Sequence, residues 1–99
     1  MKYKITFFEV PNNIGSDSVA DIDRKRRGEY LWSHTESVIP RVGEFFNQVV
    51  HIGGLRWEQT MFKVEGVVYQ VYRHDNKGDY TSEEDDQISL NVHVYLSRV

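Results

Sequence analysis

The side chains that could perform catalysis or hold a metal are scattered along this chain. The four histidines, His34, His51, His74 and His93, lie far apart and form no HxH, HxxxH or HExxH motif. The chain has no cysteine, which excludes disulfides, thiolate catalysis and cysteine-based zinc or iron–sulfur sites. No serine lies in a GxSxG elbow, and no GxGxxG or P-loop motif is present. We therefore expect a protein that is not an enzyme and that holds no metal or cofactor.

A run of four basic residues, Arg24–Arg27, stands out in a chain whose formal net charge is −3. One interpretation is a nucleic-acid contact, because Lys and Arg neutralise phosphates. The run contributes +4 to the total of −3, so the rest of the chain carries −7, and that charge repels nucleic acid at long range. An acidic protein partner is a second interpretation. The run could also pair with the four acids Glu83–Asp86, within one molecule or between two copies, or both segments could be solvated loops.

Aromatic side chains are the other candidate contacts, because Trp, Tyr and Arg dominate binding hot spots. Trp57 lies in GGLRWEQT, which we interpret as a loop between strands that exposes the indole; a lid over one end of the core is the alternative. Trp32 is a further candidate anchor. Six side chains are expected on the outer face of a predicted hairpin: Val68, Gln70, Tyr72, Asn91, His93 and Tyr95. Such a face suits a peptide, base or sugar, although strands also favour aromatic residues without any ligand.

Alternating apolar and polar residues predict the strands that would position these side chains. In KYKITFF, Tyr3, Ile5 and Phe7 share one face of a first strand. Four further strands are expected at about 29–37, 44–52, 61–74 and 88–97. Residues 17–27 favour either a short helix, capped by Ser16 or Asp17 and stopped by Gly28, or an ordered loop.

The long strand 61–74 changes phase at Gly66. Its apolar residues occupy even positions before this glycine (Phe62 and Val64) and odd positions after it (Val67, Tyr69 and Val71). One extra residue at this point, a β-bulge, would keep both apolar sets on one face and bend the strand. We expect this strand to pair with the last one in the register that sets Arg73 opposite Ile88, although a slip of two residues would keep the same faces. The same register sets Tyr95 opposite Gly66, where its ring would cover the bare glycine backbone. On the last strand the residues expected to face inward are Ile88, Leu90, Val92, Val94 and Leu96.

Length and composition predict one mainly β domain that spans 1–99, because the chain has 99 residues and is 13% aromatic. The segments IPRVGEFFNQVV, FKVEGVVYQVY and ISLNVHVYL, within about 39–97, resemble a pattern of small uncharacterised bacterial and phage proteins. In that pattern a P-x-V-G-(E/D) turn opens an SH3-like barrel. The resemblance implies a small five-stranded SH3-like barrel and carries no catalytic residue. A strongly bent antiparallel sheet of the same strands is the alternative.

These patterns favour a non-enzymatic interaction module that binds a macromolecule, with a protein or a second copy of the chain as the expected partner. The alternative is a nucleic-acid-binding β-barrel that uses Arg24–Arg27. The candidate partner-binding residues are Arg24, Arg26, Arg27, Trp57, Tyr72, His93 and Tyr95. We expect a cytoplasmic protein without a membrane partner, because no apolar run approaches a signal sequence or the roughly 20 residues of a membrane helix.

Overall fold

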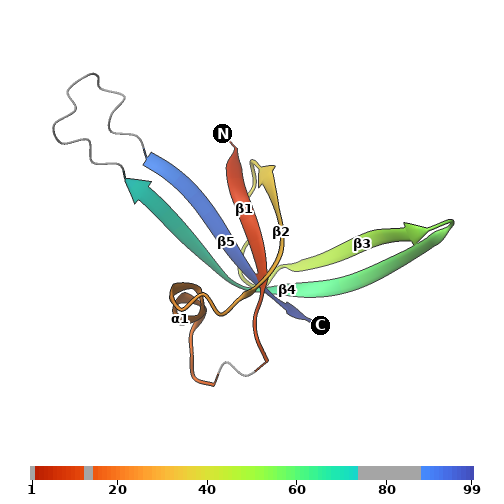
Figure 1. Ribbon diagram of the computed structural model, residues 1–99, viewed down its shortest axis with the longest axis horizontal. Helices are drawn as coiled ribbons and strands as arrows, with labels where there is room; N and C mark the ends of the chain where they lie inside the picture. Colours follow the sequence, from red (N-terminus) through yellow and green to blue (C-terminus); the bar gives the residue numbers. More distant parts are fainter. Residues whose placement is uncertain (1, 13–14, 74–87) are drawn as a thin grey trace.

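The computed structural model describes residues 2–12, 15–73 and 88–99. Its elements are, in chain order, β1 (Tyr3–Glu9), α1 (Val19–Arg24), β2 (Glu29–Glu36), β3 (Phe45–Gly53), β4 (Arg56–Arg73) and β5 (Ile88–Arg98). The strands form one curled sheet in the order β2-β1-β5-β4-β3, which makes half of a barrel (Figure 1). The prediction of a mainly β fold with five strands, a strong bend and a short helix near 17–27 is confirmed.

One strand pair is parallel, whereas purely antiparallel pairing was expected. β1 pairs with β5 in parallel, with Ile5 beside Val92 and Phe7 beside Val94. The other three pairs are antiparallel. A parallel pair needs a long connection between its strands, and here three other strands intervene in the sequence. No short-range pattern records such a pairing, so alternation alone could not reveal it.

The predicted bulge and hairpin register are both present in β4. Arg73 lies opposite Ile88 and Tyr95 lies opposite Gly66, and the register shifts between Val64 and Gly66. The bulge lies close to the change of partner along the strand, since residues 56–63 pair with β3 and residues 62–73 pair with β5. Figure 1 shows β4 bending where it leaves β5 to follow β3.

The core lies where β1, β4 and β5 meet. Its fully buried cluster consists of Ile5, Phe7, Phe62, Val64, Val92, Val94 and Leu96. The inward orientation predicted for Val92, Val94 and Leu96 is therefore confirmed. Tyr69 and Val71 were expected on the same inner face but are exposed, because no second layer covers that end of the β4–β5 hairpin within the described residues.

Helix α1 begins and ends at residues other than those predicted. Ser18, not Ser16 or Asp17, caps it and forms a capping box with Asp21. The helix ends at Arg24, well before Gly28, in a Schellman motif: the backbone N–H of Arg26 donates to Asp23 and that of Arg27 donates to Ile22. Within the described residues, no helix is long and apolar enough to cross a membrane.

Glycine at position 66 makes room for the helix. A Cβ atom there would lie 2.6–2.8 Å from three carbon atoms of the Val19 side chain. Ile22, one turn further along α1, is fully buried. We had expected the Tyr95 ring to cover this glycine, but the atoms nearest to the missing Cβ belong to Val19. The helix therefore packs directly against the bulge of β4.

Replacing Gly66 with Ala is expected to lower the free energy of unfolding by about 1–3 kcal/mol, because the added methyl overlaps Val19. Urea denaturation measures the loss. The double variant Val19→Ala/Gly66→Ala provides the control, since the smaller side chain leaves space for the methyl. Its loss should be smaller than the two single losses together, and simple additivity would contradict direct packing.

Candidate functional site

Four of the seven sequence-predicted site residues line one cavity. The cavity has a volume of about 290 Å³ and is bounded by β1, the β4–β5 hairpin and the chain from α1 to β2. Its lining includes Arg26, Tyr72, His93 and Tyr95, together with Phe8, Asp23, Gly28 and Gln70. The basic run and the hairpin face, which the sequence presents as separate candidates, therefore meet at one place.

The carboxylate of Asp23 lies at the centre of a hydrogen-bond network beside this cavity. Its Oδ1 atom accepts from the Tyr95 hydroxyl at 2.5 Å and lies 2.7 Å from Nδ1 of His93. Its Oδ2 atom accepts from the Gln70 amide at 3.0 Å. The Tyr72 hydroxyl donates in turn to Gln70 at 2.7 Å. A single residue of α1 thus connects to both strands of the β4–β5 hairpin.

Burial and hydrogen bonding act in opposite directions on these groups. The Asp23 side chain is only 8% exposed, and burial alone would raise the pKa of its carboxyl. The hydrogen bonds from Tyr95, His93 and Gln70 outweigh this effect and hold the pKa of Asp23 below its usual value. Burial and the adjacent carboxylate raise the pKa of the Tyr95 hydroxyl. Asp23 is therefore ionised at neutral pH while Tyr95 keeps its proton.

The ionised carboxylate determines which nitrogen of His93 carries a proton. A carboxylate can only accept, so Nδ1 of His93 must donate to Asp23. In the neutral ring Nε2 is then an acceptor that Asp23 does not engage. This arrangement fixes the tautomer and orientation of the imidazole. His93 is thus prepared either to bind a ligand or to accept a proton.

The outer face of the β4–β5 hairpin is not the open surface that alternation predicts. Tyr95 is only 2% exposed, so its assignment as a surface anchor is wrong. The reason is that Asp23 of α1 packs over this face and binds Tyr95, His93 and Gln70. Tyr72 remains accessible at the edge of the covered area.

Asp23 itself was missed, although the sequence contains a signal for it. The pattern Ser18-x-x-Asp21 is a capping box and sets the first helical residue at Val19. Asp23 is then four residues after Val19, on the same helix face. The cap candidates Ser16 and Asp17 lie one or two residues before the true cap, so the sequence prediction gave the helix a different register and did not single out Asp23.

The basic run is largely neutralised by acids of its own segment. Arg24 pairs with Asp21 at 3.0 Å, while Lys25 and Arg27 pair with Asp17 at 3.2 and 2.6 Å. Arg26 makes no ion pair with any described residue and lines the cavity instead. The suggested partner segment Glu83–Asp86 lies outside the described residues. The four cations therefore do not form one continuous basic surface.

A second candidate surface is the β3–β4 arm, defined here as residues 45–63. Figure 1 shows this pair of strands projecting away from the rest of the sheet. Its exposed apolar side chains are Phe45, Val49, Val50, Ile52, Leu55, Trp57 and Met61. Leu55, at the tip, is 97% exposed. Within the arm these side chains lie on both faces, so neither face is covered by the chain itself.

Trp57 belongs to this arm and is exposed, as predicted, but it lies in a strand and not in a loop. Gly53 and Gly54 adopt φ values of 123° and 56°, which allow a tight turn, so β4 already begins at Arg56. The Trp57 ring packs beside His51 with centroids 4.6 Å apart. Its exposed fraction of 59% excludes the alternative that it forms a lid on the core.

The two edges of the sheet differ in their protection. β2 forms one edge and carries Glu29 and Glu36 at its ends, whereas β3 forms the other. Residues 45–55, which comprise β3 and its turn, contain no Asp, Glu, Lys, Arg or Pro. Natural sheets commonly use such residues to prevent an edge strand from pairing with another chain. The β3 edge lacks this protection.

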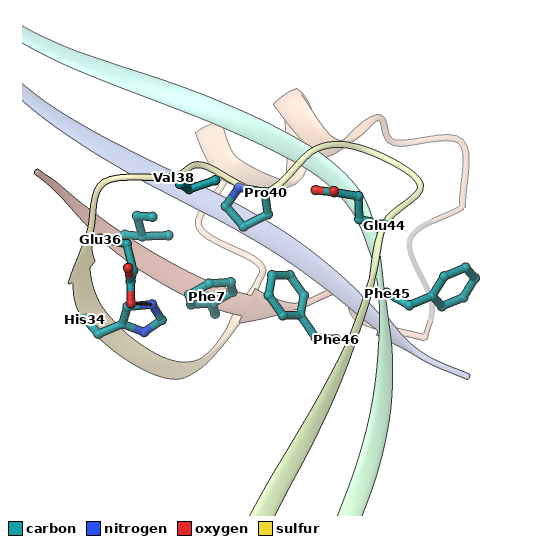
Figure 2. Close-up of a pocket in the computed structure, with 9 residues that line it drawn as sticks. Phe7, His34, Glu36, Val38, Pro40, Glu44, Phe45 and Phe46 are labelled. Atoms are coloured by element: carbon teal, nitrogen blue, oxygen red, sulfur yellow. Dashed lines mark ion pairs between the residues drawn. The ribbon is translucent and has the colours of Figure 1, made fainter. Parts of the chain in front are cut away.

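An apolar groove lies between these two edges on the open side of the half-barrel. It has a volume of about 350 Å³ and is lined by Ile5, Phe7, His34, Glu36, Val38, Pro40, Glu44, Phe45 and Phe46. Figure 2 shows the Phe7 and Phe46 rings side by side; they pack edge to face with their centroids 5.6 Å apart. Figure 2 also shows His34 and Glu36 on one side of these rings and Glu44 and Phe45 on the other. The groove therefore has an apolar floor and an acidic rim.

Comparisons with family models, curated proteins and solved structures give no match to this chain. The resemblance to small bacterial and phage proteins therefore stays a prediction. Among the residues that the structure describes, no group of three His, Cys, Asp or Glu side chains is placed to hold a metal ion. The site must be interpreted from its own geometry.

The lowered pKa of Asp23 predicts a specific loss of stability in acid. Because the folded-state pKa lies below the unfolded value, the carboxylate stabilises the fold above about pH 4 and loses this effect as pH falls through the folded pKa. We expect Asp23→Asn to lower the free energy of unfolding by about 1–3 kcal/mol at neutral pH. Below about pH 4 its stability should fall less steeply than that of the wild type.

Urea denaturation over a series of pH values measures both effects. Asp21→Asn is a useful control, because the pKa of Asp21 is also lowered but by its hydrogen bonds to Ser18. Asp21 does not touch the hairpin, so its loss should leave the Tyr95 ring environment unchanged in NMR spectra. An Asp23→Asn variant with the acid slope of the wild type would refute the assignment of this carboxylate as ionised.

Proposed function

We propose that this protein is a non-enzymatic module that binds another protein through its β3–β4 arm. The observation that carries the proposal is the uncharged edge strand β3, set among seven exposed apolar side chains. Soluble proteins rarely expose contiguous apolar surface unless it contacts a partner. The absence of cysteine suits a reducing compartment, and we place the protein in the cytoplasm.

The partner we infer contributes an extended segment that pairs with the free edge of β3. Unpaired backbone N–H and C=O groups of an edge strand bind such a segment in the manner of an added strand. The apolar side chains of the arm then contact the alternate side chains of the segment. Fully burying one large apolar side chain stabilises a complex by about 1.5–3 kcal/mol, so a few of the seven are enough for recognition.

The apolar groove between the sheet edges is continuous with the surface of the β3–β4 arm. Phe45 and Phe46 begin β3 and also line the groove, so the two are continuous. A segment paired along β3 would reach the groove at this end and place an apolar side chain against the partly exposed Phe46. The acidic rim, with Glu36 and Glu44, favours a basic residue next to that side chain.

The charge distribution favours a protein over a nucleic acid as the partner. Three of the four residues in the basic run already pair with Asp17 or Asp21. Paired cations release fewer counterions from phosphates and so add little affinity for nucleic acid. The β3–β4 arm offers Arg56 and Lys63 at its two ends, too few cations to follow a phosphate backbone.

Substitution of Val49 with Lys is expected to weaken partner binding by about tenfold or more, because it places a charge in the middle of the uncharged edge. Ligands are selected from a displayed peptide library against the wild-type protein, and their affinities are measured by calorimetry. Thr35→Lys is the matched control, since Thr35 is an exposed residue of β2, the opposite edge. It should leave the affinity unchanged.

Hydrogen exchange then locates the bound segment. Added ligand should slow exchange of β3 amides and leave β2 amides unchanged. Light scattering shows whether the segment comes from another protein or from a second copy of this chain. A dimer that Val49→Lys converts to a monomer identifies a second copy as the partner. Selected ligands that bind Val49→Lys as tightly as the wild type, or that protect β2, would refute the proposal.

A further inference from the structure

The cavity beside Asp23 has the features of a binding site independent of the β3–β4 arm. The Asp23 carboxylate is saturated, since Tyr95, His93 and Gln70 occupy both of its oxygen atoms. These three donors offset part of the negative charge that the ionised carboxylate keeps beside the cavity. Arg26, His93 and Phe8 also line the cavity, and Arg26 contributes a guanidinium while His93 has an Nε2 atom that Asp23 does not engage. At about 290 Å³, the cavity is at the lower end of the roughly 300–1,000 Å³ typical of ligand pockets.

Arg26 occupies a backbone position that usually belongs to glycine. It is the residue after the C-cap of α1, with φ at 55°, and within the described residues it alone among non-glycine residues has a positive φ. A side chain in this conformation is strained, and glycine commonly takes this place in the Schellman motif. The cavity lining therefore includes a cation on a strained backbone, without an ion-pair partner among the described residues.

His93 adds a second requirement to the ligand. Its Nδ1 donates to Asp23, so in the neutral ring Nε2 can only accept a hydrogen bond. A ligand that satisfies both groups must offer oxyanion oxygens to Arg26 and a hydroxyl proton to His93. Simple oxyanions without a proton satisfy only the first of these groups.

We propose that this cavity binds a small molecule that carries both an oxyanion and a hydroxyl group, with Arg26 holding the oxyanion and His93 accepting from the hydroxyl. Hydrogenphosphate, HPO₄²⁻, is the smallest species with both features, and hydroxylated phosphates or hydroxy acids share them. The Phe8 ring, stacked on Tyr95 with centroids 5.2 Å apart, provides the apolar wall for the remainder of such a ligand.

NMR titration with inorganic phosphate and with sulfate tests this proposal on the full chain. In mildly alkaline buffer both probes are dianions of similar size, but only hydrogenphosphate carries a proton. We expect saturable shifts at Arg26, Tyr72 and His93 with phosphate in the millimolar range, and at least about tenfold weaker binding of sulfate. Binding of the two ions with equal affinity, or an absence of saturable shifts at these residues, would overturn the proposal.

Variants of the basic run distinguish a site from general charge attraction. Arg26→Gln should weaken phosphate binding by about tenfold or more. Arg24→Gln removes the same charge from a neighbouring residue that pairs with Asp21 outside the cavity, and it should bind like the wild type. An equal loss in both variants would overturn the proposal.

The Arg26→Gly variant separates a loss of phosphate binding from a loss of stability. Glycine adopts the observed φ without strain, so this variant should melt at a higher temperature than the wild type while losing phosphate affinity. The combination of higher stability and weaker binding is not expected from a residue with only a structural role. Retained affinity in this variant would contradict the assignment of Arg26.

Discussion

The hydrogen bonds of Asp23 hold the helix against the sheet, and the arrangement of the cavity depends on them. A buried carboxylate is costly unless donors surround it, and here three side chains of the β4–β5 hairpin do so. The same hydrogen bonds orient His93 and hold α1 over Tyr95. They also place the end of α1 where Arg26 can line the cavity. Without Asp23 the hairpin face would be the open, unspecialised surface that its alternation suggests.

The half-barrel explains why the apolar side chains of the β3–β4 arm stay exposed. Its core lies where β1, β4 and β5 meet, and β3 continues beyond that region in company with β4 alone. Two-stranded arms gain little stability from their own packing, so their apolar side chains remain in water. Covering Leu55, Trp57 and their neighbours requires a surface that the described chain does not supply.

Local patterns predicted the strands and even the bulge, because alternation, glycine and hairpin register are recorded within short stretches of sequence. The register of β4 against β5 followed from one phase change at Gly66. The parallel β1–β5 pair and the Asp23 network could not be predicted in this way, since both join residues that are far apart in the sequence: Asp23 is 47, 70 and 72 positions from its three hairpin partners. Residue types alone were enough to name Arg26, Tyr72 and His93 as candidate binding residues. That they line one cavity could not be predicted, because it depends on the helix register.

The concentration of positive charge in an acidic protein now has a physical account. Asp17 and Asp21 form ion pairs with three members of the run and thereby fix the segment that surrounds α1. Arg26 is left for the cavity. This segment rests on the bulge of β4 through Val19 and Gly66, a few residues after Phe62 and Lys63, where β4 passes from β3 to β5. Because β4 forms one strand of the arm and then lines the cavity through Gln70 and Tyr72, the two surfaces share one continuous strand.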